Sequence, residues 1–419
     1  MPKETLLADT LRIAVRRFDA FDSAIERQWS DYVTSTGSKA TLEYESLDLN
    51  PLVDRLFTSN GLKNGDIDLA FIVTDWIADA VASDALLDLA PYLASRPVEG
   101  YPDQWSSTLT RFQQFGDRIY GLPYHDGPEC LIYRKDLFED AAERQAFEDI
   151  YGTQLEVPTT WDAFEKIARF FNRPESGRFG TIFAGYPDGH NTVYDFCIQL
   201  WSRGGELFDA HGRPTIASDA AIMGLDFYRR MMADRSVTPA GLEEIDSVRS
   251  GIMFAEGSVA MMVNWFGFAA LCEQFASPTK DKVSVAPVPT TSGSERAALN
   301  VYWVLSVGSG SRNADLAYDF IRHCMIPEMD RVTTLEGGIG CRLSTWSDPE
   351  VNDLIPFYKL LPDLHQHTRE LPRSRALPAL SAIIDKAVQE AITTNEATES
   401  ILHRAQKSAN VISLQDALS

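Results

Sequence analysis

The sequence contains no continuous run of about twenty apolar residues, so no segment is long enough to cross a bilayer as a helix. Cysteine is scarce. The cysteines form no C-x-x-C pair and have no histidine at zinc-ligand spacing, which excludes a structural zinc finger. Because their number is odd, at least one thiol must stay unpaired, and we expect each to be buried as a small apolar side chain. The five cysteines are Cys130, Cys197, Cys272, Cys324 and Cys341.

Catalytic motifs are also missing. There is no G-x-S-x-G elbow, no G-x-x-x-x-G-K-[ST] phosphate loop, no H-E-x-x-H zinc motif, and no G-x-G-x-x-G after a predicted strand. No repeat of about 20 to 50 residues occurs, which excludes solenoids and propellers. We therefore expect no catalytic residue, no metal site and no cofactor.

Basic residues are few: 38 stand against 60 acidic ones, and the formal net charge is -22. Such a protein repels phosphate backbones and anionic lipid surfaces, so we expect no nucleic-acid partner. The N-terminal sequence MPKETLLADT lacks the basic start and apolar stretch of a secretory signal. The 44% of hydrophobic residues is typical of a globular protein, and 419 residues exceed what one core usually organises, which predicts two lobes.

The first part of the chain alternates between strand-like and helix-like patterns. Apolar, β-prone runs predict strands over residues 11–15, 41–47 and 66–73. Helical spacing over residues 20–34, and a proline that opens residues 51–57, predict the helices between them. Repeated βα units predict a mostly parallel sheet flanked by helices.

Residues 116–138, GDRIYGLPYHDGPECLIYRKDLF, differ from their surroundings, because two short extended runs flank a bend that contains proline and glycine. We expect the chain to cross between lobes here. A second α/β lobe follows, opened by an amphipathic helix from Trp161. Further along the chain, strands are predicted at 180–185, 258–263, 282–289 and 300–307, and helices at 381–392 and 397–412.

Segment 116–138 resembles the signature of the extracellular solute-binding proteins, in the carbohydrate-binding group that includes maltose-binding protein. There, G-x-x-Y-G-x-P-Y leads into L-x-Y-N-K-D-L-F, and Arg134 stands where asparagine is commoner. Other segments resemble the family in order and spacing, and together the resemblance covers nearly the whole chain from Leu11 to Ile412. They are the strand, ligand loop and helix at 66–93, the W-x-x-G-G hairpin at 201–209, the F-x-x-G-x-A-A-M segment at 254–268 and the P-x-P segment at 286–307.

The resemblance implies an α/β, two-lobed periplasmic-binding-protein-like fold. Each lobe would be a mostly parallel sheet flanked by helices, with a hinge between the lobes and a helical C-terminal layer. We expect residues 1–124 and 289–332 to form the N-terminal lobe, and residues 125–288 and 333–419 the C-terminal lobe.

The implied function is that of the substrate-binding subunit of an ABC importer. It would capture a mono- or oligosaccharide in an interlobe cleft by hinge closure and deliver it to a membrane permease. The resemblance further implies a monomer, located in the periplasm or held at the cell surface as a lipoprotein, whose export signal has been removed from this chain.

Ligands of open α/β sheets lie beyond the carboxyl ends of the strands, so the loops after the predicted strands form the candidate site. Carboxylates, guanidinium groups and aromatic faces suit the hydroxyls and C–H patches of a sugar. Asp75 also matches a sugar-contacting carboxylate of the family, with helix capping as its alternative role. The first-lobe candidates are Arg16, Arg17, Phe18, Asp19, Asp48, Thr74, Asp75 and Trp76.

The crossover, the second lobe and the returning strand at 300–307 supply the remaining candidates. Tyr194 matches an aromatic position that stacks on sugar in the family, and Trp265 lies in the segment that resembles its aromatic ligand loop. Core packing is the alternative role for these aromatic residues. Arg342 lies where the family often has a loop that reaches the cleft, although Cys341 replaces the usual neighbour. The full set is His125, Asp126, Glu129, Tyr194, Asn264, Trp265, Phe266, Tyr302, Trp303 and Arg342.

Three arginines, Arg16, Arg17 and Arg342, suggest the further hypothesis that the ligand is an acidic sugar. Against it, neutral sugars are also held by arginine, and consecutive residues of an extended strand point to opposite faces. Two alternatives for the whole protein stay open. One is a glycosidase-like enzyme with paired carboxylates, and the other is the same fold binding a polyol, a peptide or another non-sugar solute.

Overall fold

The computed structural model describes residues 9–274 and 277–412, which divide into two units. The first unit consists of residues 9–126 and 301–359. The second consists of the described residues within 127–300 and 360–412. In the described part, the chain therefore passes from one unit to the other three times, at 126/127, 300/301 and 359/360.

These boundaries differ from those predicted at 124, 289 and 333. Residues 289–300 belong to the second unit, where strand β10 (Ala298–Leu299) pairs with β12 (Thr368–Arg369). Residues 333–359 belong to the first unit, where Gln28 Nε2 donates to Thr333 Oγ1 at 2.9 Å. Contacts between segments that are distant in sequence set both boundaries. A local sequence pattern does not predict such contacts.

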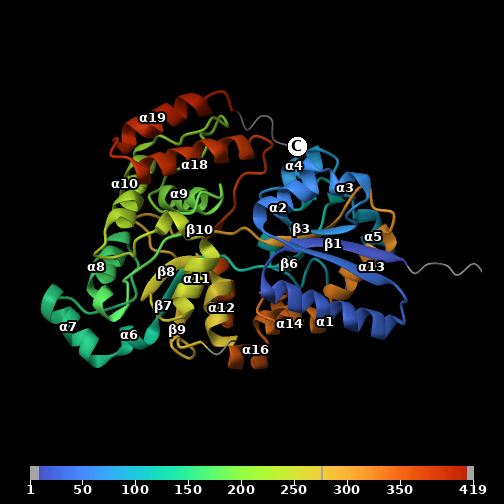
Figure 1. Cartoon of the computed structure of the whole chain (residues 1–419), viewed down its shortest axis with the longest axis horizontal. Helices are drawn as coiled ribbons and strands as arrows, with labels where there is room; N and C mark the ends of the chain where they lie inside the picture. Colours follow the sequence, from blue (N-terminus) through green and yellow to red (C-terminus); the bar gives the residue numbers. More distant parts are fainter. Residues whose placement is uncertain (1–8, 275–276, 413–419) are drawn as a thin grey trace, which may run out of the picture. The chain divides into compact units, whose positions relative to one another are not determined.

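The sheet of the first unit has five strands in the order β2, β1, β3, β11, β6 (Figure 1). Strand β1 runs parallel to β2 and β3, and β11 runs antiparallel to both β3 and β6. Four strands therefore point the same way, as predicted. Their bounds are β1 Thr10–Arg16, β2 Thr41–Leu47, β3 Leu69–Val73, β6 Leu122–His125 and β11 Trp303–Val307.

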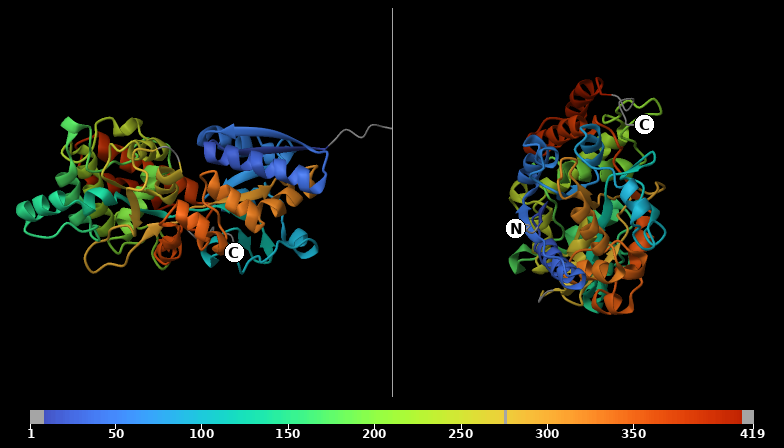
Figure 2. Two further views of the ribbon diagram at one scale, coloured as in Figure 1. Left: turned by 90° about the horizontal axis from the view of Figure 1, so that it is seen from below. Right: turned by 90° about the vertical axis from the view of Figure 1, so that its right-hand side faces the viewer.

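Burial explains why these segments form strands. Every residue of β3 is buried, as expected for an apolar run covered on both faces. On one face lie α1 (Asp19–Thr36), α13 (Ala314–Cys324) and α14 (Pro327–Leu335), and Figures 1 and 2 show the blue α1 beside the orange α13 and α14. Buried Gln28 on α1 links them to the sheet, because it donates to Met329 O at 2.9 Å and accepts from Tyr124 Oη at 2.8 Å.

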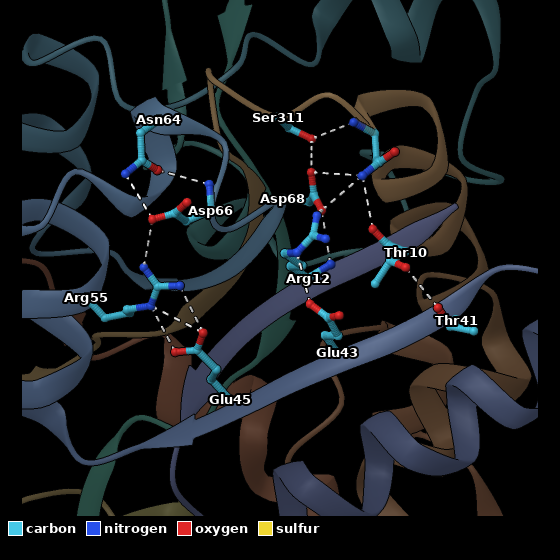
Figure 3. Close-up of polar contacts among 11 residues, drawn as sticks. Thr10, Arg12, Thr41, Glu43, Glu45, Arg55, Asn64, Asp66, Asp68 and Ser311 are labelled. Carbon is cyan, nitrogen blue, oxygen red and sulfur yellow. Dashed lines mark hydrogen bonds and ion pairs between the residues drawn. The ribbon is translucent and has the colours of Figure 1, made fainter. Parts of the chain in front are cut away.

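A polar network fixes the amino-terminal ends of β1, β2 and β3 (Figure 3). Asp68 is only 1% exposed, and it accepts hydrogen bonds from Arg12 N at 3.0 Å and Ser311 Oγ at 2.6 Å. Arg12 in turn pairs with Glu43 at 2.9 Å. A buried carboxylate with several donors holds a loop firmly. The amino-terminal edge of this sheet is thus occupied by structural contacts.

The second unit is built on a three-stranded sheet in the order β8, β7, β9, and both of its pairings are antiparallel. The prediction of a mostly parallel sheet in this lobe is therefore wrong for these strands. Predicted strand 180–185 joins no ladder, because its amides donate to separate partners, such as Thr181 N to Val237 O at 2.9 Å. The bounds are β7 Glu129–Arg134, β8 Met261–Trp265 and β9 Val283–Ala286.

Helices of the second unit follow the predicted pattern closely. Helix α8 (Trp161–Phe171) begins after Thr160, whose Oγ1 accepts from Ala163 N at 3.2 Å as an N-cap. The predicted C-terminal helices are α18 (Leu377–Thr393) and α19 (Thr398–Ala409). They pack together and against α9 (Asn191–Trp201) and α10 (Asp219–Ala233), and Figure 1 shows the red layer beside the green helices. The predicted helical C-terminal layer is confirmed.

The remaining elements are short. Predicted helix 51–57 is divided between α2 and a π-helical turn at Asp54–Thr58. The others are α2 Leu49–Val53, α3 Gly61–Asn64, α4 Ile77–Ala82, α5 Ala90–Ser95, β4 Gln114–Phe115, β5 Arg118–Ile119, α6 Lys135–Glu139, α7 Ala141–Tyr151, α11 Ser247–Ala255, α12 Phe266–Gln274, α15 Leu343–Trp346, α16 Pro349–Leu354 and α17 Leu361–His365.

All five cysteines are buried, as predicted for each of them. All five are also unpaired, whereas their odd number required this of only one. Burial is the largest cause of the raised pKa at each of the five thiols. Among the described residues, no helix combines the length and the hydropathy that a bilayer span requires.

Candidate functional site

Twelve of the predicted site residues gather at one edge of the first unit's sheet. The four strands that share a direction end there, and antiparallel β11 begins there, since Trp303 pairs with both Val73 and His125. This is the edge where open α/β sheets hold ligands. The residues are Arg16, Arg17, Phe18 and Asp19 after β1, Asp48 after β2, Thr74, Asp75 and Trp76 after β3, His125 and Asp126 at β6, and Tyr302 and Trp303 at β11.

Half-buried aromatic rings line this edge. The rings of Trp76 and Trp303 lie 5.8 Å apart, edge to face at 86°, and both side chains keep part of their surface exposed. Phe18, also half-buried, lies 5.2 Å from Phe21, which in turn contacts His125 at 4.7 Å. Partly exposed aromatic faces are the surfaces on which sugar C–H groups can stack. Phe18, Trp76 and Trp303 thus lie at the sheet edge, and contact with a ligand stays a prediction for all three.

His125 is held as a neutral imidazole. Its Nδ1 accepts a hydrogen bond from Ile339 N at 2.9 Å, which leaves Nε2 as the protonated nitrogen. Burial lowers the pKa of His125 to about 4, although the neighbouring Asp126 carboxylate opposes the shift. Asp126 is buried, and its amide donates to Ile339 O at 3.0 Å. The loop at Ile339 therefore supports this end of β6, which sequence reasoning missed.

Arg16 and Arg17 both pair with the same carboxylate. Arg16 Nη1 lies 3.1 Å from Asp48 Oδ1, and Arg17 Nη1 lies 3.0 Å from Asp48 Oδ2. The two guanidinium groups converge because β1 ends at Arg16, so the alternation of an extended strand no longer applies beyond it. Asp48 thus offsets one of the two charges. Asp19, next along the chain, is exposed in the first turn of α1.

Arg342 is a structural residue, contrary to the prediction that it reaches a ligand. It is fully buried in the first unit, where Nη1 donates to Met325 O at 2.8 Å and Glu99 O at 3.1 Å. Its guanidinium carbon also lies 4.4 Å from the centre of the Trp105 ring. With Asp48 paired to Arg16 and Arg17, and Arg342 in the core, the argument from arginine for an acidic sugar loses its support.

Four further candidates are buried in structural roles. Thr74 N donates to Tyr302 O at 3.0 Å, which ties β3 to β11, and Tyr302 Oη donates to Gln113 Oε1 at 2.8 Å. Asn264 Nδ2 donates to Ser247 O at 3.1 Å, which ties β8 to α11. Phe266 is fully buried at the start of α12. All four residues are buried. Packing or hydrogen bonding within the unit explains the positions of Thr74, Asn264, Phe266 and Tyr302.

In the second unit, three predicted residues come together. Glu129 pairs with Trp265 in the register of β7 and β8, and the Trp265 ring lies 5.7 Å from the Tyr194 ring of α9, edge to face at 89°. Trp265 is half-buried, whereas Tyr194 is 5% exposed and also contacts His190 at 5.6 Å. We call Glu129, Tyr194 and Trp265, together with Asp195 beside Tyr194, the acidic aromatic cluster.

The carboxyl groups of this cluster are unusual. Glu129 is 5% exposed, and no side chain or amide of the described residues donates a hydrogen bond to its Oε2. Burial and the nearby Asp195 raise the pKa of Glu129 well above its usual range. Burial also raises the pKa of Asp195 to about 7, and the nearby Asp188 adds to the shift. Both carboxyl groups are therefore protonated more readily than carboxyl groups in water.

Sequence reasoning missed Asp195 and Asn300. Asp195 directly follows Tyr194, so its position beside a predicted aromatic was the available signal. Asn300 is 1% exposed, and neither polar atom of its side chain has a hydrogen-bond partner within the described residues. It follows β10, which contacts both β7 and α9, the strand and helix that carry the acidic aromatic cluster. Buried polar atoms without partners are typical of places that a ligand or water fills.

Comparisons with known proteins bear on the family and the fold of this chain. A family model described as bacterial extracellular solute-binding protein matches residues 19–325. A probable amino-acid ABC transporter periplasmic-binding protein of Sinorhizobium fredii is 26% identical over 336 residues, which cover 78% of this chain and 71% of that protein. The mannitol-binding protein of Pseudomonas aeruginosa is 22% identical over 88% of this chain and 85% of its own length. The maltose-bound structure of MalE3 from T. maritima has a TM-score of 0.84 and 22% identity, and covers 96% of this chain and 100% of that chain.

Proposed function

This chain belongs to the bacterial extracellular solute-binding protein family, and we propose that it captures a carbohydrate or a polyol for an ABC importer. It has the two-lobed α/β fold of the maltose-binding type. Its relatives include a mannitol-binding protein, and a maltose-bound structure shares its fold. The ligand class proposed here covers sugars and polyols, because both present dense hydroxyl groups.

The observation that carries the proposal is the chemistry of the sheet edge in the first unit and of the acidic aromatic cluster in the second. Both combine half-buried aromatic faces with polar side chains, at Trp76 and Trp303 in one unit and at Trp265 in the other. A polyhydroxylated ligand needs flat apolar faces for its C–H groups and donors and acceptors for its hydroxyls. We propose that each unit contributes one set of contacts.

Ligand capture works by population shift in this proposal. A ligand that contacts residues of both units stabilises the state in which both sets of contacts are made, by an amount equal to its differential affinity. The three passages of the chain between the units would act as the hinge. Release to the permease then requires that the ligand-bound state be only moderately favoured over the open state.

The proposal also covers location, partners and chemistry. We propose that the protein acts outside the cytoplasmic membrane, as a monomer that docks on a membrane permease and binds no nucleic acid. The net charge of -22 supports the last point, because phosphate groups are repelled. We further propose that it returns its ligand chemically unchanged. The paired carboxyl groups of the second unit belong to binding in this view, since nothing beside them resembles a catalytic motif.

A thermal-shift screen followed by calorimetry tests the proposal. The purified chain is heated with hexoses, oligosaccharides, hexitols and amino acids, and a sugar or polyol is expected to raise the melting temperature because it binds only the folded state. Chromatography of the recovered ligand is expected to show the same compound. A shift with amino acids alone would contradict the ligand class, and a changed product would indicate an enzyme.

A further inference from the structure

The acidic aromatic cluster holds two carboxyl groups without a compensating cation. No Lys or Arg contributes to the electrostatics of Glu129 or Asp195 within the described residues. Arg369 acts on the nearby Cys197, but it pairs with Glu206 and lies 4.8 Å from the Trp201 ring. Burying carboxylates is costly unless they are paired or protonated.

The groups that act on Glu129 and Asp195 show the same imbalance, and α18, which packs against α9, adds a further acid, Asp385, which accepts a hydrogen bond from Thr192 Oγ1. The titratable or charged groups that act on Glu129 or Asp195, or lie among their neighbours, are acidic or neutral apart from Arg369. They are Asp188 and His190 before α9, Asp195 and Cys197 on α9, Cys130 on β7, Tyr228 on α10 and Arg369 on β12. Strands β8 and β9 contribute no charged side chain.

The cluster also supplies an aromatic face. Trp265 pairs with Glu129 across β7 and β8 and is half-buried, so part of its ring stays open to a ligand. Tyr194 meets the Trp265 ring edge to face and thereby fixes its orientation. A tryptophan face beside an unpaired carboxyl group is the arrangement that attracts an organic cation, by cation–π and charge-assisted contacts together.

From this cluster we infer that the ligand carries a protonated amine, which binds between Glu129, Asp195 and the face of Trp265. The inference rests on the proposed function and narrows it to basic sugars and amino polyols. The described residues hold no group of three or more metal-ligating side chains, so the two carboxyl groups do not form part of such a cluster. An amine needs only the two acids and the aromatic face.

The sign of the pH dependence separates this inference from binding of a neutral ligand. Because burial raises the pKa values of both carboxyl groups, protons compete with an ammonium group for them. Affinity for an amine should therefore rise with pH for as long as the amine itself stays protonated. A neutral polyol that accepts a hydrogen bond from the protonated acid would show the opposite trend.

Calorimetry with matched ligands tests the inference. D-glucamine and D-glucosamine are compared with D-glucitol and D-glucose, which lack the amine. We expect the amines to bind about tenfold or more tightly than their parents, with release of about one proton, measured in two buffers of different ionisation enthalpy. Affinity for D-glucamine should increase between about pH 6 and about pH 8.

Two variants locate the effect. Glu129→Gln should reduce the preference for the amine to less than about threefold and lower proton release, because only Asp195 is then left to ionise. Glu273→Gln is the matched control, since Glu273 is also buried in the second unit with one oxygen, Oε1, unpaired, but its Oε2 accepts from Asp281 N at 2.9 Å. It should keep the preference. If Glu129→Gln fails to fold, the pH trend of the unmodified chain decides.

Three outcomes overturn the inference. Neutral parents that bind as tightly as the amines would contradict it while leaving the proposed function intact, and so would an affinity for D-glucamine that falls with rising pH. If no sugar, polyol or amine binds in the screen, the proposed function fails and the inference fails with it.

Discussion

The role of Arg342 offers the sharpest test of the structure against the sequence, because the two give opposite predictions. If Arg342 reached a ligand, replacing it would weaken binding and leave stability nearly unchanged. In the structure its side chain is buried and makes charge-assisted hydrogen bonds to Met325 O and Glu99 O, at 2.8 and 3.1 Å, and to Gln104 Oε1. Replacement should therefore reduce stability and spare binding.

The expected loss in the free energy of unfolding follows from these contacts. Arg342→Ala removes the donor of the buried acceptor Met325 O, the part-buried hydrogen bonds to Glu99 O and Gln104 Oε1, and the cation above the Trp105 ring, and it leaves the volume of the side chain empty. Each buried acceptor left without a partner costs about 1 to 3 kcal/mol, and loss of one member of a buried charged network costs about 3 to 5 kcal/mol. We expect the free energy of unfolding to fall by about 3 to 5 kcal/mol.

Urea denaturation measures this loss, and calorimetry with the best ligand of the screen measures affinity. Arg331→Ala is the control, because Arg331 is about one-third exposed and pairs with Asp348 at 3.5 Å on the surface. Such a pair contributes about 0 to 1 kcal/mol. If Arg342→Ala stayed within about 1 kcal/mol of the parent but lost more than about tenfold in affinity, the structural role would be refuted.

Three further predictions concern the candidate site. Trp265→Ala and Trp303→Ala should each weaken binding of the best ligand about 10- to 100-fold in calorimetry, because each removes an aromatic face. A loss below about twofold would remove that ring from the site. Lowering the pH from about 6.5 to about 4 should reduce the free energy of unfolding by about 3 kcal/mol through His125, whose folded pKa of about 4 makes the unfolded chain bind more protons. His125→Asn should lack that part of the pH dependence in thermal unfolding. Asp48→Asn should change stability by less than about 1 kcal/mol but improve binding of D-glucuronate relative to D-glucose, since Arg16 and Arg17 lose their shared anion. Equal affinities before and after would contradict this.

Local patterns in the sequence were enough to predict most elements. Strand β1, helix α8 with its Thr160 cap, and the C-terminal helices all follow from apolar periodicity and end signals that lie within a few residues. The edge of the first sheet was also predictable, because parallel strands bring their carboxyl ends together whatever their order. That rule selected Asp48 and Trp76, whereas His125 was assigned to the crossover and Trp303 to the start of a returning strand, and only the pairings of β11 bring these two to the same edge.

What the sequence did not contain were pairings between distant segments. Residues 180–185 look like a strand, but Gly180 lies so close to α8 that an added Cβ would meet Ala168 O at 1.8 Å, and the backbone finds separate partners. Arg342 was predicted to reach a ligand because it lies where the family often has a loop that reaches the cleft, whereas hydrogen bonds to Met325 O and Glu99 O hold it in the interior. Asp195 gains its importance only from Glu129, which is distant in sequence.

The burial of all five cysteines has a practical consequence. Because all five native cysteines are buried and their pKa values are raised, they should react slowly with maleimides under native conditions. A cysteine introduced at exposed Ser59 in the first unit and another at exposed Met223 in the second would then be the preferred labelling sites. Energy transfer between dyes at these two positions would turn the chain into an optical reporter of its own ligand, with a signal that follows the separation of the two units.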